Sequence, residues 1–296
     1  MGKLRKYDNL AFFLFILPWI IGFSVFFLVP FGTSIFYAFT DAKLPGSVDY
    51  NFIGLGNFAE MLKSPIFGKS LFNTMYFVII GVPVVTAGML VLAMLLNLKV
   101  KGIALYRTFY YLPTLVPIVA TVIIWRLVFN SEFGILNAVL GIFGAEKTDW
   151  LGGKYTIKPI IILLQVWISG SGVLIFLAAL KNVPRHLHEA AEIDGASAVR
   201  RFFSITLPMI SSSILFVVII QTMYNFQMFT EALLLSKGGP NYASYTFVYN
   251  IYKSAFTDLK FSMAMAQSLF LFMLISLVTA TLMKLSKRFV YNEAGN

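Results

Sequence analysis

The chain has 296 residues, of which 58% are hydrophobic and only 12% are charged, and its mean hydropathy is +0.81. Soluble domains carry about 25% charged residues, so the main solvent of this chain is lipid. A soluble enzyme, a disordered chain and a repeat solenoid are therefore excluded. The sequence contains no cysteine and two histidines, so thiolate chemistry is absent and we expect no metal site.

Six apolar segments are each long enough to cross a bilayer, which takes roughly 20 helical residues. Because these runs are continuously apolar, we predict an all-α, polytopic membrane protein whose six transmembrane helices form a single domain over residues 1–296. Pro18 and Pro30 predict a kink in the first segment. The predicted helices lie at residues 10–39, 71–98, 106–129, 158–180, 206–230 and 262–284.

The flanks of these segments form two sets that differ in charge. The N-terminus, 99–107, 181–205 and the C-terminus together hold 13 basic and 5 acidic residues. The other set, 40–70, 126–158 and 231–261, holds 10 basic and 8 acidic residues in longer loops. The positive-inside rule therefore predicts that both termini lie in the cytoplasm. The basic flanks are explained as anchors at the lipid bilayer, and we expect no nucleic-acid partner.

The middle thirds of the first, second, fourth, fifth and sixth segments contain no Asp, Glu, Lys, Arg or His. In the third segment, Arg126 lies near the outer end. A charge at the membrane midplane is costly and is retained for function, so their absence argues against an ion-coupled pump and an intramembrane enzyme. The nearest match to a phosphate-binding loop, Gly152-Gly153-Lys154-Tyr155, has Tyr after the lysine. Any nucleotide hydrolysis must then occur on a separate subunit.

Polar side chains form a stripe on the fifth segment. Gln221, Tyr224, Asn225 and Met228 recur at i, i+3, i+4 and i+7, which places them on one helix face. Moving an unpaired amide into hydrocarbon costs about 4–8 kcal/mol, so this face should meet a cavity or another helix. Amides beside a tyrosine ring suit sugar hydroxyls, but hydrogen bonds between helices explain the stripe equally well.

The fourth segment carries a second stripe of Gln165, Ser169 and Gly172, with Gly170 and Ser171 beside it. A glycine lets either a ligand or a neighbouring helix approach the backbone closely. The residues of this stripe are therefore candidates for a substrate surface or for tight helix packing.

The loop at 181–205, between the fourth and fifth segments, predicts two short helices joined by a turn. The first helix runs from Arg185 to Ile193 after Pro184, and Gly195 ends it. A helix pair along the cytoplasmic surface suits docking into a groove of another protein. A plain amphipathic surface helix is the alternative.

This loop resembles the EAA loop of binding-protein-dependent ABC importer permeases. Glu189-Ala190-Ala191 is followed after three residues by Gly195, and after nine more residues by Ile205, Leu207 and Pro208, at the spacing of that family. The resemblance covers nearly the whole chain and is to the six-helix form of the maltose-type first permease of the carbohydrate branch. Other segments similar to that branch are Tyr106-Arg107-Thr108, Leu112-Pro113, Trp125-Arg126, Leu177-Ala178-Ala179-Leu180 and Gly238-Gly239-Pro240-Asn241.

The resemblance implies the type I ABC importer permease fold and a role for two sets of residues. The loop corresponds to a coupling helix that sits in a cleft of an ATP-binding subunit. The residues implied in coupling are Glu189, Ala190, Ala191, Asp194, Gly195, Leu207 and Pro208. The residues implied in substrate binding are Gln221, Tyr224, Asn225, Met228, Gln165, Ser169 and Ser171, with Ile168 beside them.

The resemblance also implies partners. We expect a second permease subunit in a heterodimer, two ATP-binding subunits that hold ATP and Mg²⁺, and an extracytoplasmic sugar-binding protein. This chain itself is expected to hold no cofactor and to catalyse no reaction. Its location would be the cytoplasmic membrane of a prokaryote.

The uncharged stripe favours a neutral sugar or oligosaccharide as the transported solute. Because Met228 and Ile168 are apolar where the family pattern has polar or aromatic residues, the sugar is expected to differ from maltose. Two alternatives stay open from the sequence. One is an ABC importer permease for a non-sugar solute such as an amino acid or phosphate, and the other is an ATP-independent carrier.

Overall fold

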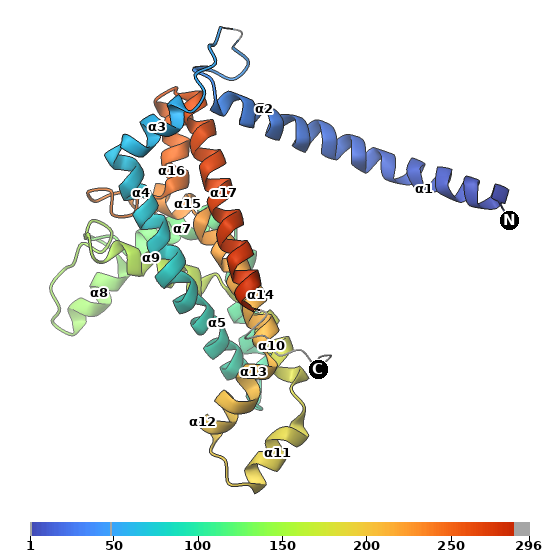
Figure 1. Ribbon diagram of the computed structural model, residues 1–296. Helices are drawn as coiled ribbons and strands as arrows, with labels where there is room; N and C mark the ends of the chain where they lie inside the picture. The colour runs from blue at the N-terminus through green and yellow to red at the C-terminus, as the bar shows by residue number, and fades with distance from the viewer. Residues whose placement is uncertain (1, 48, 287–296) are drawn as a thin grey trace. The chain divides into compact units, whose positions relative to one another are not determined.

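The computed structural model describes residues 2–47 and 49–286, with side chains in the first helix described from residue 11. The described chain is helical (Figure 1), apart from connecting loops and an isolated antiparallel bridge between Thr40 and Phe52. The elements are α1 (Gly2–Phe23), η1 (Ser24–Leu28), α2 (Val29–Ala38), α3 (Gly56–Lys63), α4 (Pro65–Tyr76), η2 (Phe77–Gly81), α5 (Val82–Leu96), α6 (Ile103–Tyr111), η3 (Leu112–Leu115), α7 (Ile118–Val128), α8 (Ile135–Ile142), α9 (Ile157–Trp167), α10 (Gly170–Asn182), α11 (Arg185–Ile193), α12 (Ala198–Arg201), η4 (Phe202–Thr206), α13 (Leu207–Met209), α14 (Ser211–Phe226), α15 (Thr230–Ser236), α16 (Phe247–Tyr252), η5 (Lys253–Thr257) and α17 (Phe261–Ser286).

The chain divides into two compact units. The first comprises Met1–Ser64 with Ile251–Phe272, and the second comprises Pro65–Asn250 with Met273–Asn296. That both units act as one domain over 1–296 stays a prediction.

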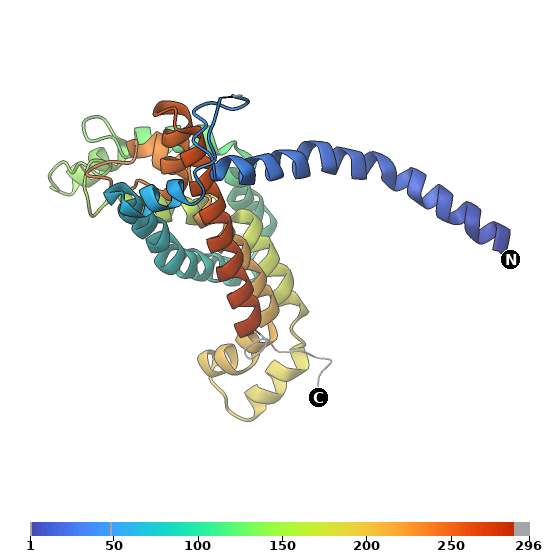
Figure 2. The ribbon, with the colours of Figure 1, turned by 45° about the horizontal axis from the view of Figure 1, so that its top comes forward.

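The first unit contains the first predicted span. α1, η1 and α2 run on from one another as a continuous helix (Figure 2). At the end of α2, Thr40 Oγ1 lies 3.0 Å from Ser262 Oγ of α17. Asn57 of α3 donates from Nδ2 to Thr40 O at 2.7 Å. These three side chains are buried. Their hydrogen bonds to the Thr40 hydroxyl and to its main-chain carbonyl fasten the end of the first span to α17 and α3.

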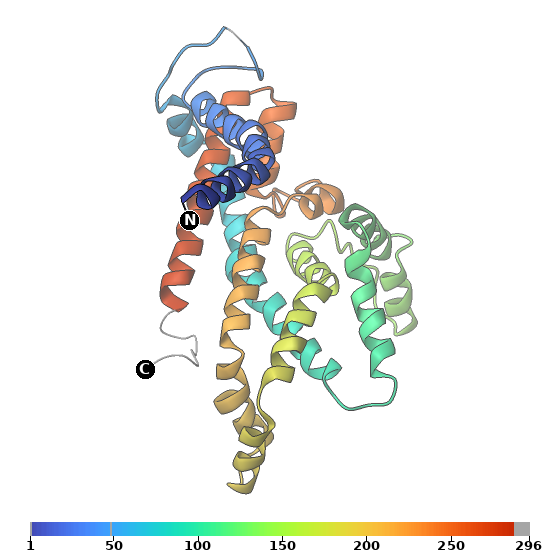
Figure 3. The same cartoon turned by 90° about the vertical axis from the view of Figure 1, so that its right-hand side faces the viewer.

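The core of the second unit is built around α5, which packs against α9, α10 and α14 (Figure 3). Phe77, Met89, Leu164 and Phe176 are fully buried in it. The sulfur of Met89 occupies the space where a Cβ on Gly172 would lie, so this glycine allows α10 to approach α5. Of the two roles that the sequence leaves open for Gly172, the structure therefore shows helix packing.

Three internal prolines each follow a five-residue π-helical turn. Pro30, Pro83 and Pro208 stand two residues after the ends of η1, η2 and η4 respectively. Proline lacks an N–H and clashes with the carbonyl four residues earlier, and a wider π-helical turn accommodates it without ending the helix. At Pro30 the predicted kink thus takes the form of a π-helical turn, whereas Pro18 lies inside the uninterrupted α1.

The number of candidate spans agrees with the six predicted from the sequence. Among the described residues, three single helices are long and apolar enough to cross a membrane, and three bent helix pairs bring the number to as many as six. The bends were not predicted, and they measure 102° between η3 and α7, 55° between α9 and α10, and 69° between α13 and α14. The predicted all-α membrane fold is confirmed.

Candidate functional site

Two amides from different helices meet in the core of the second unit. Gln165 of α9 donates from Nε2 to Asn225 Oδ1 of α14 at 3.0 Å. The same nitrogen lies 3.3 Å from the sulfur of Met228. The three side chains are buried, with exposed fractions of 2%, 0% and 2%. The structure therefore joins residues from both predicted stripes in one polar group, named here the amide cluster (Gln165, Asn225 and Met228).

Main-chain hydrogen bonds position the amide cluster. Asn225 Nδ2 donates to Gln221 O, one turn earlier on α14, at 2.9 Å. Thr246 Oγ1 donates to Met228 O at 2.8 Å, just where α14 has ended. Gly81 at the end of η2 passes beside the Asn225 amide and places no side chain there. The amide cluster is thus held from three separate parts of the chain.

One atom of the amide cluster has no partner. Gln165 Oε1 is buried and accepts no hydrogen bond from any described residue. Most buried polar atoms in folded proteins are paired, and each exception calls for a physical explanation such as a ligand. This oxygen can accept a hydrogen bond from a hydroxyl or amide that enters the core.

A carboxyl group that the charge pattern assigned to an outer loop is buried in the second unit. Glu231 of α15 is only 2% exposed, and Tyr224 donates its hydroxyl proton to Glu231 Oε1 at 2.5 Å. In the sequence, residue 231 continues the stripe from 221, 224 and 228 by one more turn. Helical periodicity does not explain its position, because α14 ends at Phe226 and α15 begins at Thr230.

The side chains of the other residues predicted to face substrate form no recorded hydrogen bond with the side chains of the amide cluster in the described chain. The Ser169 hydroxyl is buried and donates to Val166 O at 2.6 Å. Ser171 is exposed, and no side-chain hydrogen bond is recorded for it in the described chain. Gln221 is half-buried, and Tyr224 is 38% exposed. A role for these residues in binding substrate stays a prediction.

The predicted coupling loop is present as two short helices, α11 and α12, which project from one end of the second unit (Figure 1). Gly195 follows α11 with a φ of +76°. Gly195 N donates to Glu192 O at 3.0 Å, and Ala196 N donates to Ala191 O at 2.9 Å. This pair of bonds is the Schellman motif, which requires a left-handed residue where glycine stands. Gly195 therefore sets the turn as the sequence predicts.

Side chains of the loop divide into those that brace it and those that face outward. Arg201 Nη1 lies 2.7 Å from Glu192 Oε2, so an ion pair links α12 to α11. Ile193 at the end of α11 is 87% exposed. The predicted coupling residues Glu189, Ala190, Asp194, Gly195 and Pro208 are exposed, and Ala191 and Leu207 are half-buried. The loop thus presents a mixed polar and apolar surface.

Bent apolar helices around a buried amide pair, with an exposed helix–turn–helix at one end, are the features of a membrane permease. The chain belongs to the family of binding-protein-dependent transport system inner membrane components, whose family model matches residues 52–290. The resemblance drawn from the EAA loop is thereby confirmed. The family consists of membrane-embedded transport components, so this chain is a transport subunit of a binding-protein-dependent system rather than an enzyme.

Relatives with assigned names are permeases. The chain is 39% identical to the probable ABC transporter permease protein YesP of Bacillus subtilis, over 99% of this chain and 95% of that protein. It is 34% identical to the diacetylchitobiose uptake system permease protein NgcF of Streptomyces coelicolor, over 98% and 86%. It is 32% identical to the arabinooligosaccharides transport system permease protein AraP of Bacillus subtilis, over 94% and 88%.

A solved structure has the same fold. It is a crystal structure of a bacterial ABC transporter involved in the import of the acidic polysaccharide alginate. The TM-score is 0.85 at 23% identity, and the match covers 98% of this chain and 99% of the other. At this identity the comparison shows that the two chains share a fold.

Proposed function

We propose that this chain is the permease subunit through which an ATP-driven importer moves a saccharide across the cytoplasmic membrane of a prokaryote. Two named relatives take up oligosaccharides, diacetylchitobiose for NgcF and arabinooligosaccharides for AraP. The observation in this molecule that carries the proposal is the amide cluster, whose Gln165 oxygen is buried without a partner. An uncharged acceptor of this kind suits a sugar hydroxyl.

Substrate binding would use the face of α14 that the stripe defines. Gln221 and Tyr224 lie at the accessible edge, and Gln165, Asn225 and Met228 lie deeper. Opening α9 from α14 exchanges the hydrogen bond between the two amides for bonds to sugar hydroxyls. The substrate then stabilises the open arrangement relative to the closed one, as a coupled transition requires. Ser169 and Ser171 would serve a neighbouring part of the same path.

Coupling would run through the exposed loop. Glu189, Ala190, Ala191 and Asp194 would contact a cleft of an ATP-binding subunit, and Gly195 would fix the turn behind them. Leu207 and Pro208 begin the helix that leads into α14, so movement of the loop would reach the amide cluster along one element. The proposed ATP and Mg²⁺ sites are on the two ATP-binding subunits, and none is on this chain.

The proposed assembly also contains a second permease and a saccharide-binding protein. Both chain termini would lie in the cytoplasm, as the basic flanks predict. The loops at 40–70, 126–158 and 231–261 would then face the binding protein. A binding-protein partner is supported by the crystal structure of a bacterial alginate ABC transporter, which is in complex with an alginate pentasaccharide-bound periplasmic protein.

Charge reversal in the loop tests the proposal. The complete importer in proteoliposomes should take up labelled oligosaccharide only with ATP inside and binding protein outside. Glu189→Lys should abolish this uptake, because it reverses the charge of an exposed residue at the proposed ATPase contact. Glu189→Asp, which keeps the negative charge at the same exposed position, is the matched control and should retain uptake.

Three results would overturn parts of the proposal. Uptake that persists in Glu189→Lys would remove the coupling role of the loop. Uptake without ATP would favour the ATP-independent carrier. ATP-dependent uptake of an amino acid or an inorganic ion, with none for saccharides, would keep the importer and change its substrate.

A further inference from the structure

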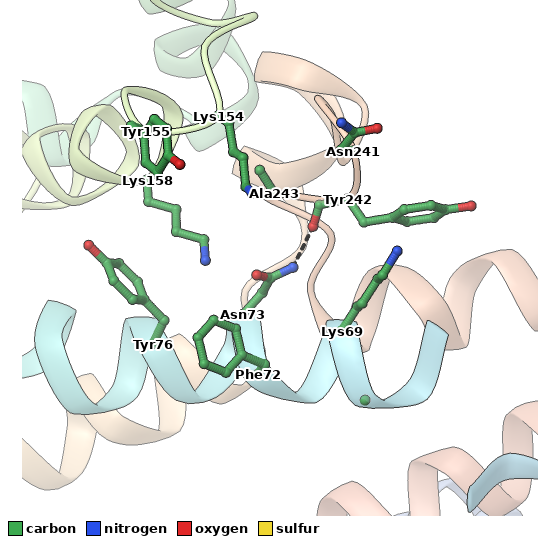
Figure 4. Close-up of a pocket in the computed structure, with 11 residues that line it drawn as sticks. Lys69, Phe72, Asn73, Tyr76, Lys154, Tyr155, Lys158, Asn241, Tyr242 and Ala243 are labelled. Carbon is green, nitrogen blue, oxygen red and sulfur yellow. Dashed lines mark hydrogen bonds between the residues drawn. The ribbon is translucent and has the colours of Figure 1, made fainter. Parts of the chain in front are cut away.

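A pocket of about 640 Å³ lies in the second unit between α4, the start of α9 and the loop before α16 (Figure 4). Ligand sites in proteins typically enclose about 300–1,000 Å³, so its size suits a small ligand. Three lysines, Lys69, Lys154 and Lys158, line it together with the rings of Phe72, Tyr76, Tyr155 and Tyr242, and its remaining lining residues are Gly68, Asn73, Asn241 and Ala243.

The three lysines rest on aromatic faces. Lys158 Nζ lies 4.5 Å from the ring centre of Tyr76 and 5.1 Å from that of Phe72. Lys69 Nζ lies 5.1 Å from the ring centre of Tyr242. In Figure 4, Lys158 extends toward Asn73 and Tyr76. Lys154 Nζ lies 5.7 Å from the ring centre of Tyr155. Contact with a ring attracts an ammonium group but leaves its N–H donors able to bind an anion.

Among the residues that the structure describes, no carboxylate lines the pocket. Within the described residues, the ion pairs recorded join Arg201 to Glu192 and Lys260 to Glu60, so none of them involves a pocket lysine. Like charges gathered in one concavity repel each other and attract an anion. The charge of this site is therefore uncompensated in the isolated chain.

The walls of the pocket are fixed by buried hydrogen bonds. Asn73 is 4% exposed, and its Nδ2 donates to Tyr242 O at 2.5 Å and to Tyr245 O at 3.0 Å. The next residue, Thr74, accepts at Oγ1 from Phe247 N at 2.9 Å. These bonds hold the loop that carries Tyr242 against α4, so the pocket is a built site rather than a loose gathering of surface lysines.

The pocket and the amide cluster share two helices. Lys158 and Gln165 are seven residues apart on α9, which places them on one face about 10 Å apart. Asn73 and Gly81 are eight residues apart on the continuous helix of α4 and η2, or about 12 Å. A ligand in the pocket thus lies about two helical turns from the amide cluster.

We propose that this pocket binds a saccharide ring that bears a carboxylate, such as a uronate, on its way to the amide cluster. Lys154 and Lys158 hold the carboxylate by charge-assisted hydrogen bonds, and the Tyr76 and Tyr242 rings pack on the apolar face of the sugar. This inference rests on the proposed saccharide import and extends it from neutral to acidic oligosaccharides. The uncharged stripe is no obstacle, because the anionic group is bound outside it.

A pair of matched sugars tests the inference. Trigalacturonate and its fully methyl-esterified form have the same rings, but the ester is neutral. Equilibrium binding of each labelled sugar is measured on the complete importer in nanodiscs of phosphatidylcholine, with no binding protein present. These discs contain no anionic headgroup that could occupy the pocket. Wild type should bind the acid at least about tenfold more tightly than the ester, and 500 mM salt should reduce the difference.

Lysine variants assign this preference to the pocket. Lys158→Met should remove most of the preference for the acid while the affinity for the ester stays unchanged. Lys154→Met should also weaken binding of the acid. Because Lys154 lies in an exposed loop outside α9, this result would show that the effect of Lys158→Met does not come from misfolding of α9. Lys147→Met is the matched control, because Lys147 is exposed outside the pocket and donates to Glu132 O.

The failures of the two proposals are distinguishable. Equal affinity of wild type for acid and ester would overturn the inference while saccharide import stands. If Lys158→Met lost affinity for the sugar-free binding protein while its preference for the acid stayed unchanged, the lysines would be a docking site for that protein. This result would also overturn the inference. No binding of either sugar together with no uptake of any saccharide would overturn the proposed function itself.

Discussion

The amide cluster and the 181–208 loop are two functional regions of the same unit that are stabilised in opposite ways. In the cluster, Gln165 and Asn225 are almost fully buried and their side chains bond to each other. In the loop, the side chains of Glu189 and Asp194 are exposed, and main-chain bonds around Gly195 define the turn. One region is specified by its side chains, and the other is specified by its backbone.

This difference predicts how each region responds to mutation. A change in the amide cluster alters stability and substrate binding together, because the same atoms serve both. A change in the outward-facing loop side chains alters coupling and leaves stability nearly intact, since exposed groups contribute little to folding. Four substitutions test this separation, in order of decreasing effect on stability.

Tyr224→Phe should have the largest effect. It removes the hydroxyl that donates to Glu231 and leaves a buried carboxyl group without its side-chain partner. Leaving a buried polar group without its partner costs about 1–3 kcal/mol, and more if the group is charged, so thermal unfolding of the purified importer should begin at a clearly lower temperature. Tyr106→Phe is the control, because Tyr106 is 62% exposed and has no recorded hydroxyl partner in the described chain. Identical unfolding temperatures for the two variants would show that the Glu231 contact does not stabilise the fold.

Asn225→Leu should have the second-largest effect on stability. It deprives Gln165 Nε2 of its oxygen acceptor inside the core, which costs about 1–3 kcal/mol for a buried polar group. Saccharide affinity and unfolding temperature should fall together, whereas the ATP hydrolysis measured without saccharide or binding protein should persist. Met223→Leu, on an exposed face of the same helix, should change neither quantity. Normal saccharide affinity in Asn225→Leu would separate the amide cluster from substrate binding.

Gly195→Ala should destabilise the fold less than Asn225→Leu does, and its main effect should be on coupling to the ATPase subunits. A side chain at φ +76° costs about 1–2 kcal/mol, and the Schellman turn should open to relieve it. ATPase activity stimulated by the loaded binding protein should drop while saccharide affinity is retained. Gly32→Ala is the matched control, because that glycine is inside α2, away from the proposed outer loops, with open space around it. Unchanged stimulation in Gly195→Ala would mean that the turn geometry is not used in coupling.

The sequence predicts this fold well because both of its main signals are local. Long apolar runs define the spans, and Gly195 with its fixed neighbours defines the loop turn, so neither needs knowledge of what packs against it. The bends between consecutive helices, in contrast, are not set by local sequence signals. The 55° change between α9 and α10 depends on Gly170, where a Cβ would meet the Thr114 hydroxyl of a distant segment, and no local pattern contains that contact.

The candidate sites also depend on contacts between distant segments that no local pattern contains. Periodicity places Asn225 and Met228 on one face, but only the fold shows that Gln165 is their partner and that Ser169 turns toward Tyr110 instead. The lysine pocket was not predicted, because Lys69 and Lys158 are 89 positions apart in the numbering and each is ordinary alone. Residues that meet through tertiary packing leave no joint signal in a single sequence.

Glu192→Gln should have the smallest effect. It removes the ion pair with Arg201, whose two side chains are 71% and 21% exposed. Exposed pairs contribute about 0.2–1 kcal/mol and are screened by salt, so the unfolding temperature should change little, and less still at 500 mM salt. Because Glu192 also supplies a main-chain carbonyl to the turn, which the substitution retains, ATPase stimulation should stay near that of wild type. A loss of stimulation as large as in Gly195→Ala would show that the Glu192 side chain contacts the ATP-binding subunit. The loop would then be specified by its side chains as well as its backbone.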